Sequence, residues 1–284
     1  MTIINGRKIA QEIIADLKLR PKPEKFMAAI LVGDDPASAN FINQKKKTAE
    51  ELGIDFRLYN FAEELNNDEL REEVGKIAGH GTCGGVIVQL PLPERINKNY
   101  ILNVVSREKD VDVISERAIG AFYVGRNPVL PPAVGTVKQI VSTLNLELST
   151  LSVAVVGLGF LIGKPVSVWL MDKAKELILL DKFSDLSAIK NADIVISGVG
   201  KAGLIDAKML KDGASVIDFG YSITQIDADD TQINADKKTV ISGDFDAEQL
   251  AISHKQLAFY TPTPGGTGPI LVAKLFENFY NLNQ

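Results

Sequence analysis

The alternation of short apolar runs with helical stripes constrains the fold of this chain more than any other feature. Residues 26–32 form a continuous apolar run closed by Gly33-Asp34-Asp35-Pro36, as expected of a buried strand followed by a turn. Residues 37–52 have helical periodicity, Gly53 fits the end of that helix, and residues 54–61 supply a second strand. Strands that alternate with helices favour a parallel sheet covered by helices. The chain is therefore predicted to have an α/β fold.

The same alternation continues to the end of the chain. Further helices are predicted at residues 3–18, 67–78, 137–144, 164–170 and 270–280. Further strands are predicted at residues 85–90, 152–156, 176–180, 194–197, 215–219 and 239–242. A length of 284 residues exceeds that of one average domain, so two domains are expected, although one large α/β unit stays open. The Pro- and Gly-rich segment 127–135 is the predicted hinge between them.

Charge and cysteine content exclude several classes of protein. The formal net charge of -5 argues against binding of nucleic acid or of an anionic membrane surface, because such binding needs clustered Lys and Arg. Residues 1–8 lack the features of a signal peptide, and no apolar run reaches the about 18 residues of a membrane span, so a cytoplasmic protein is expected. Cys83, His80 and His254 cannot supply the usual zinc ligands, so no metal is expected.

A glycine-rich turn follows the predicted strand at residues 153–156. Gly157-Leu158-Gly159 begins it, and Gly163 ends it at the start of a predicted helix. Such glycines let the backbone approach a pyrophosphate, and the helix N-terminus attracts the anion. The spacing is one residue longer than the usual fingerprint, so a plain strand-to-helix turn is the alternative. The turn indicates a Rossmann-like, doubly wound parallel sheet in the C-terminal domain.

Other residues extend this predicted dinucleotide site. Asp181 ends the next predicted strand, where an acidic residue typically binds the ribose hydroxyls and repels a 2′-phosphate. This predicts NAD rather than NADP, unless Asp181 only caps a loop or pairs with Lys182. A third glycine turn, Gly198-Val199-Gly200, also follows a predicted strand and is expected to flank the nicotinamide half. Tyr221 is a further candidate cofactor-binding residue.

Three polar residues stand out in the N-terminal half. Lys45 follows Phe41 by four residues, so both side chains project from one helix face. Gln89 ends a predicted strand, and Asp112 closes the string KDVD. Each has an ordinary alternative. A lysine run such as 45–47 is usually a solvated helix face, Gln89 could be a polar strand end, and Asp112 could cap a helix.

Six strings in this chain together carry a family resemblance. They are PASANFINQKKKTAEELGI, GGVIVQLPLP, KDVD, GKP, VIDFG and TPTPGGTGP, in this order. The chain resembles, over nearly its whole length, the bifunctional methylenetetrahydrofolate dehydrogenase/cyclohydrolase family. The resemblance implies a catalytic, folate-binding domain at residues 1–135 plus a C-terminal helix at about 266–284. It also implies an NAD(P)-binding Rossmann domain at 136–265, with a substrate cleft between the two domains.

The resemblance further implies what the site residues do. Lys45 would be the central catalytic residue, Gln89 would orient it, and Asp112 would hold the pterin ring of the tetrahydrofolate substrate. Further substrate-binding positions implied by the family are Phe41, Leu90, Pro264, Gly265 and Gly266. The implied reaction moves a hydride from methylenetetrahydrofolate to NAD or NADP, then hydrolyses the methenyl product to 10-formyltetrahydrofolate. Hydride transfer needs alignment, whereas hydrolysis needs an amine of lowered pKa. A homodimer is implied by analogy.

The chain departs from the family pattern at several positions. Phe41 replaces the usual Tyr, which keeps a ring for stacking but removes its hydroxyl. Leu158-Gly159 replaces Arg-Ser and so loses a cation and a hydroxyl suited to phosphate. Val113 follows Asp112 where glycine is usual, and Ala133 lies within a typical P-C-T-P run, so substrate contacts there are expected to differ. The alternatives are a dehydrogenase without the hydrolysis step, a catalytically reduced folate- or nucleotide-binding homologue, and a dehydrogenase of another substrate.

Overall fold

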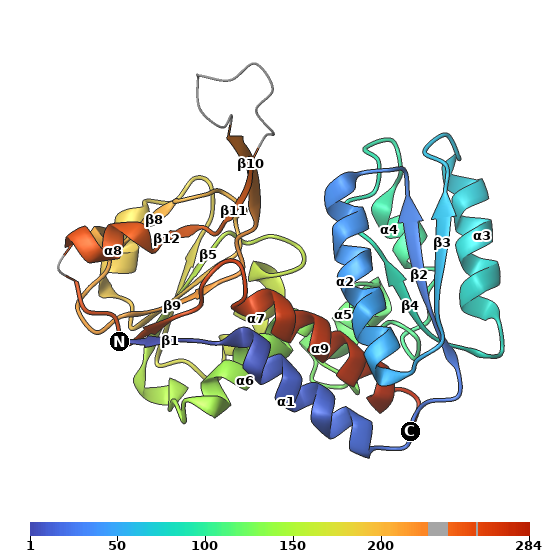
Figure 1. Cartoon of the computed structure of the whole chain (residues 1–284), viewed down its shortest axis with the longest axis horizontal. Helices are drawn as coiled ribbons and strands as arrows, with labels where there is room; N and C mark the ends of the chain where they lie inside the picture. The colour runs from blue at the N-terminus through green and yellow to red at the C-terminus, as the bar shows by residue number, and fades with distance from the viewer. Residues whose placement is uncertain (227–237, 254) are drawn as a thin grey trace. The chain divides into compact units, whose positions relative to one another are not determined.

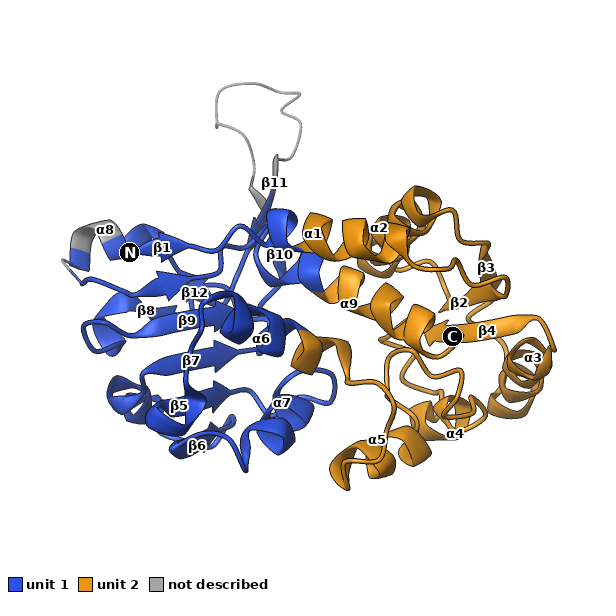
Figure 2. Cartoon of the chain, turned by 90° about the horizontal axis from the view of Figure 1, so that it is seen from below, with its two compact units in different colours: residues 1–9, 136–270 blue, residues 10–135, 271–284 orange. Residues whose placement is uncertain are grey.

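The chain forms two compact units in a computed structural model that describes residues 1–226, 238–253 and 255–284. Unit 1 comprises Met1–Ile9 and Thr136–Ile270, and unit 2 comprises Ala10–Gly135 and Leu271–Gln284 (Figure 2). The first nine residues thus group with unit 1, whereas the sequence reasoning assigned them to the N-terminal domain. The domain boundaries drawn from the sequence stay a prediction.

Unit 2 is built on a parallel sheet of three strands in the order β3-β2-β4. The strands are β2 (Phe26–Val32), β3 (Phe56–Phe61) and β4 (Cys83–Val88). Helix α2 (Pro36–Leu52) joins β2 to β3, and α3 (Asn67–Gly79) joins β3 to β4 on the other side of β2. Right-handed crossovers in opposite directions place the two helices on opposite faces, as Figure 1 shows. The chain therefore reverses its direction of winding at β2, where ligands of such sheets bind.

The C-terminal helix completes the core of unit 2. Helix α9 (Thr267–Asn281) buries Phe276, Phe279 and Tyr280. Its Asn278 side chain donates hydrogen bonds of 2.8 Å to the carbonyl oxygens of Val111 and Leu130. The remaining helices of this part of the chain are α1 (Gly6–Leu19), α4 (Lys98–Leu102) and α5 (Glu116–Tyr123). The end of the chain is thus tied to the segment that follows β4.

Unit 1 is built on a parallel sheet of six strands in the order β1-β13-β9-β7-β5-β6. The strands are β1 (Thr2–Ile3), β5 (Ser152–Val156), β6 (Glu176–Leu180), β7 (Ile194–Ser197), β9 (Ser215–Asp218) and β13 (Phe259–Tyr260). From β5 the chain passes through α7 (Gly163–Leu170) to β6 and then returns to β7 on the other side of β5. The winding therefore reverses between β5 and β7.

Shorter elements surround this sheet. Strand β10 (Ser222–Ile226) pairs antiparallel with β11 (Lys238–Ser242), and β8 (Ile205–Asp206) pairs parallel with β12 (Phe245–Asp246). The helices are α6 (Pro132–Thr143), α8 (Glu248–Ser253) and the short 3-10 segments Leu148–Thr150, Leu186–Asn191 and Ala207–Met209. Among the described residues, no helix has the length and apolar character needed to cross a bilayer.

The predicted α/β fold with a doubly wound parallel sheet is confirmed, but several boundaries differ. The strand predicted at 85–90 lies at Cys83–Val88, so Gln89 and Leu90 follow it. The predicted hinge at 127–135 ends where the two units divide, after Gly135, and its last residues form the start of α6, because proline suits a first helical turn. The predicted helix at 3–18 begins at Gly6 after a short strand. The predicted strand at 239–242 pairs with β10 rather than with the main sheet.

Candidate functional site

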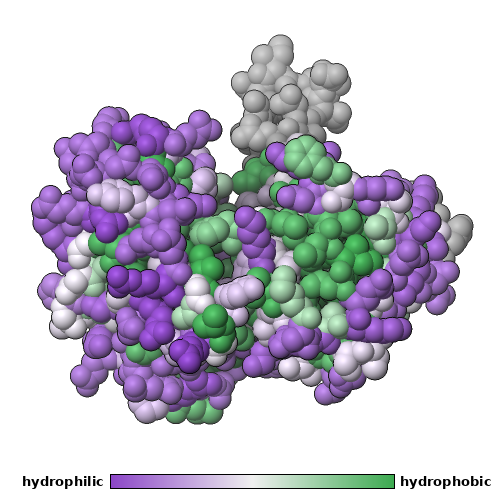
Figure 3. All heavy atoms as spheres, turned by 180° about the vertical axis from the view of Figure 1, so that it is seen from behind, coloured by the Kyte–Doolittle hydropathy of each residue, from purple (hydrophilic) through white to green (hydrophobic). Residues whose placement is uncertain are grey.

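Apolar side chains are exposed on both units, so their exposure does not mark a site. Figure 3 shows one face, on which hydrophobic residues gather near the middle and hydrophilic residues lie around them. Tyr123 of unit 2 and Leu161 and Phe183 of unit 1 are among the exposed large apolar residues. Single exposed apolar side chains are normal on protein surfaces. Buried polar groups are the more informative features.

Helix α2 places Lys45 in the interior of unit 2. The helix begins at Pro36, and the carboxylate of Asp35 caps it by accepting a 2.7 Å hydrogen bond from the backbone N–H of Ser38. Its buried residues form one stripe, namely Ser38, Ile42, Lys45, Ala49 and Leu52. Lys46 and Lys47 are exposed. The solvated-face interpretation of the lysine run is therefore wrong for Lys45 and correct for its two neighbours.

Gln89 holds the Lys45 ammonium from the end of β4. The Lys45 Nζ donates a 2.9 Å hydrogen bond to Gln89 Oε1, and both residues are buried. Gln89 Nε2 donates in turn to the Leu90 carbonyl oxygen at 2.7 Å. The Gln89 backbone N–H donates to the Ile30 carbonyl oxygen of β2 at 2.9 Å. Because the amide nitrogen is already directed at a carbonyl, its oxygen is fixed as the acceptor for Lys45.

Asp112 interacts electrostatically with Lys45. Burial lowers the pKa of the Lys45 amine, and the negative charge of Asp112 acts in the opposite direction. Burial raises the pKa of Asp112 to about 6, the Lys45 ammonium opposes this shift, and Asp110 adds to it. The structure thus brings Lys45, Gln89 and Asp112 together. An amine and a carboxyl group that both titrate closer to neutrality are suited to proton transfer and to ligand binding.

The turn that carries Asp112 is held by its neighbours. Asp110 is buried, and its Oδ2 accepts hydrogen bonds from the backbone N–H groups of Ile114 (3.0 Å) and Ser115 (2.7 Å). Val113 has a φ of +57° and is buried in an apolar cluster with Ala118 and Val129. A left-handed conformation is unfavourable for a β-branched residue, by roughly 1–2 kcal/mol. Burial of Val113 offsets this strain, so the turn forms without glycine.

The other predicted substrate residues fall in two places. Phe41 is half-buried one turn before Lys45 on α2, and Leu90 is half-buried next to Gln89. Pro264, Gly265 and Gly266 belong to unit 1, where the Gly266 N–H donates to the Pro262 carbonyl oxygen at 2.8 Å. These three residues therefore belong to a different unit from the Lys45 cluster.

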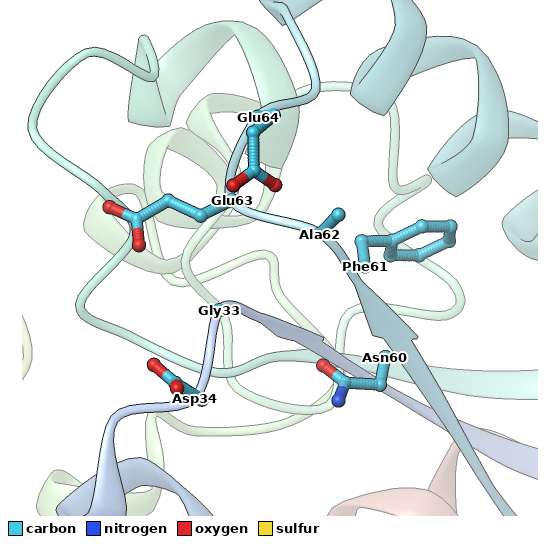
Figure 4. Close-up of a pocket in the computed structure, with 7 residues that line it drawn as sticks. All are labelled: Gly33, Asp34, Asn60, Phe61, Ala62, Glu63 and Glu64. Atoms are coloured by element: carbon cyan, nitrogen blue, oxygen red, sulfur yellow. The ribbon is translucent and has the colours of Figure 1, made fainter.

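Unit 2 also has a polar hollow that the sequence did not indicate. It has a volume of about 320 Å³ beside the ends of β2 and β3 (Figure 4). Acidic side chains line it, namely Asp34, Glu63 and Glu64. None of the predicted site residues, all of which the structure describes, lines this hollow. Its negative charge makes it unsuitable for an anionic ligand.

The glycine turns of unit 1 form a tightly packed cradle. Gly157 has a φ of +84°, and a Cβ atom there would lie 2.7 Å from Val199 Cγ2. A Cβ atom on Gly163 would overlap the carbonyl oxygen of Gly157, and one on Gly198 would lie 2.6 Å from Ile162 Cγ2. The turns after β5 and β7 therefore pack backbone against backbone where the winding of the sheet reverses. These residues fit the pyrophosphate of a dinucleotide, which needs this close approach of the main chain.

Asp181 lies where a ribose-binding acid is expected. It directly follows β6, is exposed, and donates its backbone N–H to Ser184 Oγ at 3.0 Å. Within residues 1–226, 238–253 and 255–284 it makes no ion pair with Lys182. The Lys182 ammonium instead lies 4.8 Å from the centroid of the Phe183 ring. The alternative that Asp181 pairs with Lys182 is therefore wrong.

The remaining cofactor candidates surround the same cradle. Leu158 is half-buried, and Gly159 is exposed with only the Gly198 carbonyl oxygen near, 3.9 Å from an added Cβ atom. Gly200 has a φ of +78°, and its carbonyl oxygen accepts a 2.9 Å hydrogen bond from Ser222 Oγ. Tyr221 directly precedes Ser222, so the structure places it beside the Gly198–Gly200 turn.

Two buried acids of unit 1 were missed by the sequence reasoning. Asp218 and Asp244 are almost completely buried beside the cofactor turns. Asp218 lies within VIDFG, but only the string as a whole was used. A signal was available, because aspartate in an apolar context next to glycine is unusual unless it is hydrogen-bonded. Among the described residues no three His, Cys, Asp or Glu side chains are grouped as metal ligands, and His254 lies outside them.

Comparison with known proteins gives a consistent result over both units. Residues 4–112 match the catalytic domain of tetrahydrofolate dehydrogenase/cyclohydrolase, and residues 131–284 match its NAD(P)-binding domain. The chain is 34% identical to bifunctional protein FolD of Agathobacter rectalis, over 97% of this chain and 96% of that protein. It is 33% identical to bifunctional protein FolD of Bacillus licheniformis, over 98% of this chain and 95% of that protein.

Solved structures agree with the sequence relatives. The bifunctional enzyme FolD, methylenetetrahydrofolate dehydrogenase/cyclohydrolase, of Campylobacter jejuni superposes with a TM-score of 0.88 at 29% identity, covering 100% of this chain and 98% of that one. The Trypanosoma brucei dehydrogenase-cyclohydrolase, complexed with NADP and an inhibitor, gives a TM-score of 0.87 at 25% identity, covering 99% and 96%. The chain belongs to the tetrahydrofolate dehydrogenase/cyclohydrolase family.

Proposed function

We propose that this chain oxidises 5,10-methylenetetrahydrofolate to 5,10-methenyltetrahydrofolate with NAD or NADP, and hydrolyses the product to 10-formyltetrahydrofolate. The observation that carries the proposal is the buried Lys45–Gln89 hydrogen bond beside Asp112, in a member of this family. The glycine cradle of unit 1 supports it, because the oxidation needs a dinucleotide. A homodimer in the cytoplasm stays a prediction.

Unit 1 would hold the dinucleotide through its two glycine turns. When bound, the nicotinamide ring supplies the acceptor for the hydride that leaves the folate. The backbone N–H groups of the Gly157–Gly163 turn and the start of α7 would bind the pyrophosphate. Gly198, Gly200 and Tyr221 would flank the nicotinamide half, and Asp181 would accept hydrogen bonds from the ribose hydroxyls.

Lys45 is the proposed base for the hydrolysis step. The methenyl bridge is a cation, so water adds to its carbon, and the added water must then lose a proton. The bond from this carbon to N5 then breaks and N5 takes up a proton, which leaves the formyl group on N10. An ordinary lysine is protonated at neutral pH, but burial lowers the pKa of Lys45 and thereby favours the neutral amine. Through its lone pair, the neutral amine can accept the proton of the added water. Gln89 Oε1 holds one N–H of the amine and so orients the lone pair.

Asp112 is the proposed anchor of the pterin ring. Its carboxylate, when ionised, would accept hydrogen bonds from ring N–H groups, and Phe41 would offer an aromatic face to the same ring. Leu90 would contribute a carbonyl and an apolar surface next to Gln89. Pro264, Gly265 and Gly266 stay predicted substrate-binding residues of unit 1.

A dehydrogenase without the hydrolysis step is the second candidate. The observation in its favour is Phe41, which stands one turn from Lys45 without the hydroxyl that the family usually has there. The retained Lys45–Gln89 contact favours the bifunctional proposal.

The absorbances of reduced nicotinamide and of the methenyl product distinguish the candidates when followed separately. Methylenetetrahydrofolate would be added to the purified chain with NAD and, in parallel, with NADP. The bifunctional proposal predicts that reduced nicotinamide accumulates while the methenyl product is consumed. Methenyl product that accumulates in proportion to reduced nicotinamide would support the dehydrogenase-only candidate. Absence of reduced nicotinamide with both cofactors would reject both.

Cofactor preference gives a separate prediction. Asp181 repels a 2′-phosphate, and Leu158 provides no cation to bind one, so NAD is favoured. The double variant Asp181→Ser with Leu158→Arg should shift the ratio of kcat/KM for NADP over NAD upwards by roughly tenfold or more, because one favourable charge contact replaces a repulsion. Asp172→Ser is a matched control, since Asp172 is exposed and pairs with Lys173. A wild-type preference for NADP would contradict the assignment of Asp181.

A further inference from the structure

Asp244 gathers three hydrogen bonds from one short segment of unit 1. Its Oδ2 accepts from Ser197 Oγ at 2.6 Å and from the backbone N–H of Val199 at 2.7 Å. Its Oδ1 accepts from the backbone N–H of Lys201 at 2.7 Å. These donors all belong to residues 197–201, which comprise the last residue of β7 and the turn after it with Gly198 and Gly200 (hereafter the nicotinamide-side turn). The Asp244 side chain is completely buried.

The other hydrogen bonds of the turn join neutral groups: the Gly198 N–H donates to the Val156 carbonyl oxygen at 3.1 Å, and the Gly200 carbonyl oxygen accepts from Ser222 Oγ at 2.9 Å. Two of its five residues are glycines, which restrict the backbone least, and the Val199 side chain is 44% exposed. Hydrogen bonds to an ionised carboxylate are shorter and stronger than bonds between neutral groups. Asp244 therefore supplies the carboxylate hydrogen bonds that help to fix the nicotinamide-side turn.

Asp244 is itself held in place by Asp218. The Asp218 carboxylate, also buried, accepts hydrogen bonds from the backbone N–H groups of Gly220 (2.6 Å) and Phe245 (2.9 Å). A Cβ atom on Gly220 would overlap Asp244, and one on Gly243 would overlap the Asp218 carboxylate. Gly220 therefore packs directly against Asp244, and Gly243 packs directly against Asp218. Asp218, the last residue of β9, thus helps to position Asp244 and, through it, the nicotinamide-side turn.

The turn also determines the shape of the pyrophosphate cradle. Val199 Cγ2 lies 2.7 Å, and the Gly198 carbonyl oxygen 3.2 Å, from the position of a Cβ atom on Gly157. A displaced nicotinamide-side turn would therefore change the surface formed with the Gly157–Gly163 turn. We infer that Asp244 is a positioning residue for dinucleotide binding, which it supports by fixing the nicotinamide-side turn. This inference rests on the proposed function of unit 1.

Asp244→Asn tests the inference, because it keeps the side-chain volume but replaces one acceptor oxygen by an N–H donor. Calorimetric titration of the full chain with NAD and with NADP should show a Kd raised roughly tenfold or more, as expected from losing hydrogen bonds to a charged group. The backbone amides of Val199 and Lys201 should exchange with deuterium faster in the free protein. Hydrolysis of methenyltetrahydrofolate, assigned to unit 2, should change less than about twofold, a factor within ordinary mutational scatter.

Asp246→Asn is the matched control. Asp246 stands two residues further along and caps α8 by accepting from the backbone N–H groups of Glu248 (3.1 Å) and Gln249 (3.2 Å). This variant should keep the Kd, because asparagine caps a helix about as well as aspartate does. If Asp244→Asn does not fold, Ser197→Ala removes one of the three donors and should still raise the Kd severalfold, by roughly the effect of one hydrogen bond.

Two results overturn different claims. A folded Asp244→Asn variant that binds the dinucleotide as tightly as wild type, with Val199 and Lys201 still protected, would overturn the inference alone. A wild-type chain that binds neither NAD nor NADP would overturn the proposed function, and the positioning role with it.

Discussion

At the scale of single residues, Lys45 differs from Lys46 and Lys47 in its surroundings and not in its chemistry. The three side chains are chemically identical, yet only Lys45 lies on the buried stripe of α2 and reaches Gln89. Desolvation lowers the pKa of its amine, whereas its two neighbours remain solvated. The position of each lysine on α2 therefore determines whether burial lowers the pKa of its amine.

Lys45→Met should remove the hydrolysis step. Methionine has a similar length but cannot accept a proton, so hydrolysis of methenyltetrahydrofolate should fall by roughly 10²–10⁴-fold, the usual contribution of a general base. Formation of reduced nicotinamide should persist, because hydride transfer needs alignment rather than a base. Lys46→Met is the control and should leave both rates unchanged. Equal hydrolysis in the two variants would remove Lys45 from the mechanism.

Protonation of Asp112 should weaken folate binding at acidic pH. Its pKa is raised to about 6, so the carboxylate is ionised above that pH and protonated below it. If the ionised form anchors the pterin, the KM for methylenetetrahydrofolate should rise by about tenfold for each pH unit below about 6. Asp112→Asn should have a high KM that does not depend on pH in this range. If the KM of the variant still rises as the pH falls below about 6, another group causes the pH dependence.

The same group should lower stability at higher pH. Because the pKa of Asp112 is raised from its usual 3.8 to about 6 in the folded chain, the fold favours the protonated form, and the stability present at low pH is lost as the pH rises from 3.8 to about 6. A shift of this size corresponds to at most about 3 kcal/mol. Asp112→Asn should therefore increase the free energy of unfolding in urea at pH 8 more than at pH 5. An unchanged or lower value at pH 8 would contradict the direction of the shift.

The candidate site was partly visible in the sequence at this scale. The spacing of Ile42, Lys45, Ala49 and Leu52 places Lys45 on the apolar stripe of its helix, which local composition around the lysine run obscured. The interaction of Asp112 with Lys45 could not be foreseen from periodicity, because it joins segments far apart in the chain. The left-handed conformation of Val113 was equally hidden, since its residue type argues against it.

At the scale of elements, the glycine turns show how backbone packing forms a site. Gly163 and Gly159 occur in the same turn but differ in their surroundings, since only Gly163 meets the main chain of Gly157. The longer spacing of the motif therefore still closes the turn against the start of α7.

Gly163→Ala and Gly159→Ala form a matched pair. The added methyl group at position 163 would overlap a backbone carbonyl, so the turn must shift, and dinucleotide affinity should fall by roughly tenfold or more through the loss of backbone contacts. At position 159 the methyl group comes no closer than 3.9 Å to the Gly198 carbonyl oxygen, so the turn need not shift and affinity should fall less. Binding measured by calorimetry checks both. Equal affinities for the two variants would contradict the claim that close packing at Gly163 shapes the dinucleotide site.

Strands that consist of one apolar run were predicted correctly, and strands that form only by pairing with a remote segment of the chain were missed. Strands β2, β6 and β7 have the predicted bounds because each is a self-contained apolar run. Strands β1 and β13 have only two residues each and form through pairing of Thr2–Ile3 with Phe259–Tyr260. No local pattern can reveal a pair so far apart in the sequence.

At the scale of the whole molecule, the chain passes between its two units within helices. The boundaries after Ile9, Gly135 and Ile270 fall inside α1, α6 and α9. The Pro- and Gly-rich segment 127–135 ends at the second of these boundaries, whereas no such segment marks the first. The proposed reaction requires both units, since one carries the Lys45 cluster and the other the glycine cradle.

The central claim is that a hydride passes directly from the folate methylene to the nicotinamide ring. It is tested most directly with methylenetetrahydrofolate that carries two deuterium atoms on the bridging carbon. After turnover with NAD or NADP, mass spectrometry of the reduced nicotinamide should show one deuterium atom, and the folate product should retain the other. Reduced nicotinamide without deuterium, or no reduced nicotinamide at all, would contradict the account.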